Sequence, residues 1–87
     1  MSYGAVTVTS TPTLILAANN ARRQLILDNQ SNSITVFIGP DSAITASGTV
    51  SLRPNAELEH DDRWHRGSVY GVTASGTALV AYWEVAG

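Results

Sequence analysis

Side chains able to do chemistry are concentrated in residues 57–66, which read ELEHDDRWHR. His60 together with Asp62 or His65 offers ligands for a divalent cation, and two of the carboxylates offer the acid and base of glycoside hydrolysis. None of the spacings matches a metal motif, however, and the segment follows a turn signal at Pro54-Asn55. The sequence therefore favours neither a metal site nor catalysis in this segment.

The same segment is better explained as a protein-interaction loop. Trp64 is flanked by Arg63, His65 and Arg66, and tryptophan and arginine are enriched at interface hot spots. The aspartates just before them offer charge partners for another copy of the chain. We therefore include Arg63, Trp64 and Arg66 among the candidate interface residues.

The sequence also lacks the motifs that other catalytic arrangements require. Serines are plentiful, but no G-x-S-x-G elbow occurs, and Gly48 and Gly76 are isolated turn glycines without the helix that a phosphate loop requires. A β-sandwich of 87 residues also rarely encloses a substrate-sized pocket. We predict a protein that is not an enzyme and has no catalytic, metal or cofactor site.

Net charge and composition limit the classes of partner that the chain is expected to bind. A net charge of −2 argues against nucleic acid, because phosphate binding needs a basic patch. The chain has no cysteine, no signal-peptide pattern and no apolar run of membrane-spanning length, so we expect folding in a cytoplasm and no membrane partner. All five basic residues are arginines, which suits interface use, although a GC-rich genome would explain it equally well.

Short apolar stretches with period-two alternation predict an all-β chain. Turn signals separate these stretches, and no window keeps a helical period for three turns; the one helical candidate is a single turn at 17–21. We predict one domain over residues 1–87, a compact antiparallel β-sandwich or small barrel of about seven to nine short strands. The predicted strands cover residues 5–9, 13–17, 23–29, 33–39, 43–46, 49–53, 56–60, 68–73 and 77–85.

The pentapeptide TASGT occurs twice, at 45–49 and 73–77, between these predicted strands. Its glycines, Gly48 and Gly76, can supply the positive φ that a primed two-residue turn requires. The repeat therefore predicts two tight β-hairpins. Residues 1–11 are either an arm that adds a strand to a neighbour or an edge strand of the chain's own sheet, and we favour the second.

Alternation also assigns the faces of the strands. Leu25 and Leu27 are expected in the core with Ile34, Val36 and Ile38, so Ile26 and Phe37 point outward. An exposed isoleucine paired with an exposed phenylalanine would be an apolar patch that a partner covers, unless both lie between the sheets. In the last strand both faces are largely apolar, as in a strand covered on two sides.

Three segments carry a resemblance: TPTLILAANNARRQLILDNQSNSITVFIG, TASGTVSLRPNAELE and GSVYGVTASGTALVAYWE. Together they resemble a family of small virion proteins of tailed bacteriophages, which includes capsid decoration (cement) and head-fibre proteins. The resemblance covers most of the chain and implies a β-sandwich, commonly trimeric, with no catalytic residues. The charged stretch from His60 to Arg66 departs from the family pattern.

The resemblance implies a decoration protein, assembled in the host cytoplasm, that binds the outside of the major capsid protein shell and stabilises it as a homotrimer. The alternative is a carbohydrate- or host-surface-binding module of a fibre or tail, with Trp64, Trp83, Tyr3 and Tyr70 as stacking platforms. The candidate interface residues are Ile26, Phe37, Arg63, Trp64, Arg66 and Tyr70.

Overall fold

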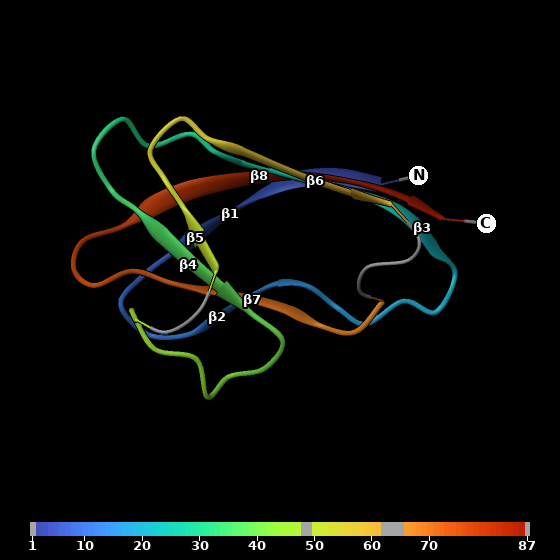
Figure 1. Cartoon of the computed structure of the whole chain (residues 1–87), viewed down its shortest axis with the longest axis horizontal. Coiled ribbons are helices and arrows are strands. Elements are labelled where there is room, and N and C mark those ends of the chain that lie inside the picture. Colours follow the sequence, from blue (N-terminus) through green and yellow to red (C-terminus); the bar gives the residue numbers. More distant parts are fainter. Residues whose placement is uncertain (1, 48–49, 62–65, 87) are drawn as a thin grey trace.

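The chain folds into eight β-strands that form two four-stranded antiparallel sheets packed face to face (Figure 1). The computed structural model describes residues 2–47, 50–61 and 66–86. One sheet has the order β1-β8-β3-β6 and the other the order β2-β7-β4-β5. The strands are β1 (Ser2–Val8), β2 (Thr13–Leu16), β3 (Arg22–Asn29), β4 (Val36–Gly39), β5 (Val50–Leu52), β6 (Glu57–Asp61), β7 (Val69–Val72) and β8 (Ala78–Ala86).

The strand pairing follows one simple rule. β4 pairs with β5, β3 with β6, β2 with β7 and β1 with β8, all antiparallel, as in one long hairpin whose bend is the β4–β5 connection. The additional pairs β3–β8 and β4–β7 close this folded hairpin into two sheets. An eight-stranded double sheet wound in this way is a jelly roll.

The predicted fold class is confirmed, with two local corrections. The described residues contain no helix, so none is long and apolar enough to span a membrane. Residues 17–21 are not helical, and only Asn20 and Ala21 form a turn. The strand predicted at 43–46 is absent; a turn occupies Ser42 and Ala43, and only Ile44 of this stretch is buried. A single buried apolar residue in a loop produced the apparent alternation.

Neither copy of TASGT forms a tight hairpin. The first lies in the long connection between β4 and β5, and its Gly48 and Thr49 fall outside the described residues. The second carries the chain from β7 in one sheet to β8 in the other. Gly76 does adopt the expected positive φ, +77°. The Thr73 hydroxyl donates a hydrogen bond of 2.8 Å to the backbone carbonyl of Gly76. The repeat marks turns, but the sheet order decides which strands they join.

The core lies between the sheets. Leu25, Leu27, Val36 and Ile38 are all buried as predicted, and Ile34 packs partly against them. They do not come from neighbouring strands, however: the two leucines belong to β3 and the other three residues to β4 or its approach, on the opposing sheet. The two inner faces therefore meet, as in other β-sandwiches.

A buried asparagine ties the loops to this core. Asn29 is fully buried, and its side-chain amide donates to the carbonyls of Ile34 at 2.8 Å, Leu52 at 2.9 Å and Arg53 at 3.2 Å. Its Oδ1 accepts the N–H of Ser31 at 3.1 Å. A polar group can be buried without large cost only when it is hydrogen-bonded in this way.

Candidate interaction surfaces

The structure separates the predicted interface residues onto two opposite faces. Ile26 lies on β3, in the sheet β1-β8-β3-β6, whereas Phe37 on β4 and Tyr70 on β7 belong to the other sheet. Each is partly buried and alternates with buried neighbours, so each side chain is on the outer side of its own sheet. Ile26 and Phe37 therefore point outward as expected, but they do not form one patch.

The predicted interaction loop is only partly described. Arg63 and Trp64, like the suggested metal ligands Asp62 and His65, lie outside the described residues. Arg66 is exposed, and its backbone carbonyl accepts a hydrogen bond of 2.7 Å from the N–H of Asn19. Within the described residues, no group of three or more His, Asp or Glu side chains is placed to hold a metal ion.

Three large apolar side chains on the outer side of the first sheet lie in a row across three strands. Tyr3 on β1 is opposite Trp83 on β8, which in turn is opposite Ile26 on β3. Directly opposite residues of antiparallel strands share a face and touch. Tyr3 is 81% exposed and Trp83 45% exposed, so the row is open to solvent in the single chain.

The apolar surface continues along β1 and β8. Leu79 is 43% exposed on the same face of β8 as Trp83, and Ala5 and Ala81 lie opposite each other between them. We call this surface the Trp83 face and define it by Tyr3, Ala5, Ile26, Leu79, Ala81 and Trp83. Most large apolar residues of a monomer are buried, and a contiguous exposed group is typical of a binding surface.

One edge of the Trp83 face is acidic. Asp28 on β3 is directly opposite Ala81 on β8, and Glu57 on β6 is directly opposite Asp28. Among the described residues neither carboxylate has an ion pair. Two like charges in directly opposite positions destabilise a strand pair. This side of the sheet is therefore apolar along the row Tyr3–Trp83–Ile26 and acidic at the neighbouring pair Asp28–Glu57.

β8 is covered on one side only. Ala78, Val80 and Glu84 face the core and are buried, whereas Leu79 and Trp83 on the other side are exposed. The expectation of a strand covered on both faces is therefore wrong for the chain by itself. The alternate apolar residues Leu79, Ala81 and Trp83 are the sequence pattern that indicates the Trp83 face.

The outer face of the second sheet is partly covered by the chain's own loop. Ile44, from the β4–β5 connection, packs on Gly39 so closely that a Cβ there would overlap its side chain. Phe37 lies opposite Val72, which is only 3% exposed. Leu14, opposite Tyr70, is a large apolar residue of this face that is 44% exposed.

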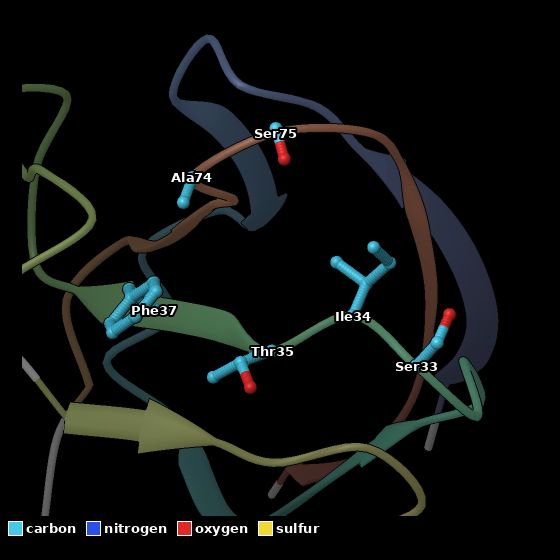
Figure 2. Close-up of a pocket in the computed structure, with 6 residues that line it drawn as sticks. All are labelled: Ser33, Ile34, Thr35, Phe37, Ala74 and Ser75. Atoms are coloured by element: carbon cyan, nitrogen blue, oxygen red, sulfur yellow. The ribbon is translucent and has the colours of Figure 1, made fainter.

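A small open cleft of about 260 Å³ lies beside Phe37 (Figure 2). Figure 2 shows its six lining side chains around the opening between the approach to β4 and the loop that precedes β8. The lining offers only hydroxyl and apolar groups, so it has no acid, base or charged group to act on a substrate. Its volume is also below that of ordinary small-molecule sites. The lining residues are Ser33, Ile34, Thr35, Phe37, Ala74 and Ser75.

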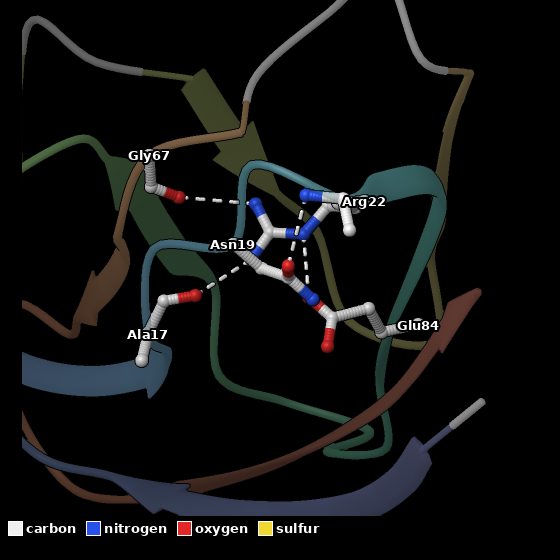
Figure 3. A network of polar contacts seen from close by, with 6 residues as sticks. Ala17, Asn19, Arg22, Gly67 and Glu84 are labelled. Atoms are coloured by element: carbon white, nitrogen blue, oxygen red, sulfur yellow. Dashed lines mark hydrogen bonds and ion pairs between the residues drawn. The ribbon is translucent and has the colours of Figure 1, made fainter. Parts of the chain in front are cut away.

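Sequence reasoning missed a buried ion pair at one end of the sandwich (Figure 3). Arg22 is 2% exposed, and its Nε donates to Oε2 of Glu84 at 2.6 Å. The guanidinium also donates to the carbonyls of Gly67 at 3.0 Å and Ala17 at 2.8 Å. It therefore joins the β2–β3 connection, the segment that precedes β7 and the end of β8. This arginine is a structural residue and not part of an exposed interface.

Comparison with known proteins finds no relative of this chain. The chain matches no protein-family model, and no significant similarity is found to curated proteins or to solved structures.

Proposed function

We propose that this chain is a structural binding protein that docks through the Trp83 face onto a larger assembly, a bacteriophage capsid that it decorates and stabilises. The observation that carries the docking role is the exposed row Tyr3–Trp83–Ile26 on a sheet whose other side already has a complete core. Binding in many copies would convert a modest contact into high avidity.

The capsid as partner is supported by the sequence resemblance. That resemblance implies that the protein binds the major capsid protein and that it binds as a homotrimer. Jelly rolls include viral capsid and lectin domains, so the architecture is compatible with this role without selecting it. The cleft beside Phe37 offers no acid or base, which supports binding over catalysis at that site.

The experiment uses phage particles stripped of this protein and then re-supplied with it. We expect wild-type protein to restore resistance to heat-induced DNA release. Trp83→Ala should weaken binding by about 30-fold or more, since truncating a central aromatic hot spot costs about 2 kcal/mol or more. Leu14→Ala is the matched control, because Leu14 is equally exposed on the opposite sheet. Equal heat resistance with and without the protein would contradict the cement role.

A second candidate function is carbohydrate binding by the same face. It is favoured by one observation: Tyr3 and Trp83 are adjacent exposed aromatic side chains, each with an apolar ring and a polar group. Such rings can stack on the apolar face of a pyranose.

A panel of soluble polysaccharides separates the two functions. Saturable binding that is lost in Trp83→Ala and Tyr3→Ala, yet kept in Leu79→Ala, would support sugar stacking. Docking on a protein surface would instead be weakened by all three substitutions, because it uses the whole apolar area. No binding to any member of the panel would remove the carbohydrate candidate.

A further inference from the structure

The two sheets have four edge strands, β1, β6, β2 and β5. An edge strand leaves alternate backbone N–H and C=O groups without a strand partner, so proteins normally protect it with charges, proline, a bulge or short length. Comparison of the four edges shows which of them is protected and which is not.

Three of the edges carry a protective feature. β6 has three acidic residues among its five, Glu57, Glu59 and Asp61. β2 is four residues long, follows Pro12 and has an irregular register between Leu14 and Leu16. β5 is only three residues long, and Pro54 lies two residues after its end.

β1 carries none of these features. Its seven residues, SYGAVTV, include no charge and no proline, and its register with β8 is unbroken from Ser2 to Val8. In the part of the chain that the structure describes, no strand other than β8 pairs with it. A long, regular and uncharged edge is the kind that pairs with another strand.

We propose that β1 pairs antiparallel with β1 of a second copy of this chain, joining the two β1-β8-β3-β6 sheets into one eight-stranded sheet. Charge favours this occupant. Two β1 strands meet without any charged residue, whereas pairing β6 with β6 would bring three acidic residues against three. The outer edges of the joined sheet are then the acidic β6 strands, so the assembly stops at two copies and does not grow into a filament.

The register of this pair follows from the strand itself. Centring the two-fold axis on Ala5 pairs all seven residues and keeps outward-facing residues opposite outward-facing ones. Tyr3 then lies opposite Thr7 of the second copy, an aromatic and β-branched pair of the type that stabilises sheets. The two Trp83 faces become one continuous surface. This inference does not depend on the proposed function. A two-fold β1 pair gives a dimer, in place of the homotrimer that the sequence resemblance implies.

The first test is the mass in solution, measured by light scattering after size exclusion. We expect twice the chain mass of 9.2 kDa for the wild type. Ala5→Lys should give a monomer, because Ala5 is exposed and the substitution places two like charges opposite each other only in the pair. Ser51→Lys, which adds the same charge to the β5 edge, should leave the dimer intact. A monomeric wild type, or a trimer unaffected by Ala5→Lys, would overturn the proposal.

The second test uses the absence of cysteine in the chain. In the predicted register the two copies of residue 5 have Cα atoms about 4.5 to 5.5 Å apart, within the range that a disulfide spans. Ala5→Cys should therefore cross-link into a covalent dimer under mild oxidation. Ser51→Cys is the control at another exposed edge. Equal cross-linking of the two variants would overturn the proposed pairing.

Discussion

Arg22, Glu84 and Asn29 are the polar residues that secure the connections of this sandwich. Each is at least nine-tenths buried, and each reaches backbone or side-chain partners far away in the sequence. Arg22 also marks the place where simple alternation along β3 fails. Strict alternation from Leu25 would place Arg23 inside, but the register of β3 against β8 shifts between Arg22 and Gln24. The bulge turns Arg22 inward and leaves Arg23 exposed.

Arg22→Met tests this network at the residue scale. We expect the free energy of unfolding to fall by about 3–5 kcal/mol, because the buried Glu84 carboxylate loses its ion pair with Arg22. The carbonyls of Ala17 and Gly67 also lose a donor. Arg23→Met is the matched control, since Arg23 is exposed, and urea denaturation of both variants provides the measurement. Equal losses in the two variants would contradict a structural role specific to Arg22.

At the scale of elements, the inward-facing side chains of the strands on either side of β7 require a glycine in β7. A Cβ on Gly71 would lie 2.8 Å from Cδ1 of Ile15 and 3.2 Å from Cγ1 of Val36. Ile15 belongs to the neighbouring β2, and Val36 belongs to β4. The glycine thus lets the inner side chains of these strands fill the space over β7. No local sequence pattern predicts this, because the crowding atoms come from residues distant in the chain.

Gly71→Ala is expected to lower the free energy of unfolding by about 1–3 kcal/mol through overpacking. Ile15→Val removes the nearest crowding atom, Cδ1, and should recover part of that loss in the double variant. A double-mutant cycle measured by thermal or urea unfolding gives the coupling energy between the two positions. Additive losses, with no recovery in the double variant, would show that the Gly71 position is not limited by Ile15.

For the whole molecule, the question is which apolar residues hold the fold and which serve an external partner. Leu27 is fully buried between the sheets, whereas Trp83 is nearly half exposed on the outer face of β8. An outer face with this much apolar surface contributes little to the chain's own stability and is available to a partner.

Leu27→Ala and Trp83→Thr are therefore expected to differ strongly in stability. The first should cost about 2–5 kcal/mol, because it leaves a cavity in the core. The second should change the free energy of unfolding by less than about 1 kcal/mol, while it reduces any binding through the Trp83 face. Chemical denaturation of the monomeric Ala5→Lys background keeps self-association out of the comparison. A loss for Trp83→Thr as large as that for Leu27→Ala would place Trp83 in the fold and not in an interface.

The sequence by itself determined the all-β class, most strand positions, the inward side of Leu25, Leu27, Val36 and Ile38, and the outward side of Ile26 and Phe37. These follow from alternation along single strands, which is a local property. Only the tertiary structure decided that β3 and β4 lie in different sheets, that the second TASGT crosses between the sheets, and that Tyr3, Trp83 and Ile26 form one row. Strand order and register depend on contacts between residues far apart in the chain, and no period in the sequence records them.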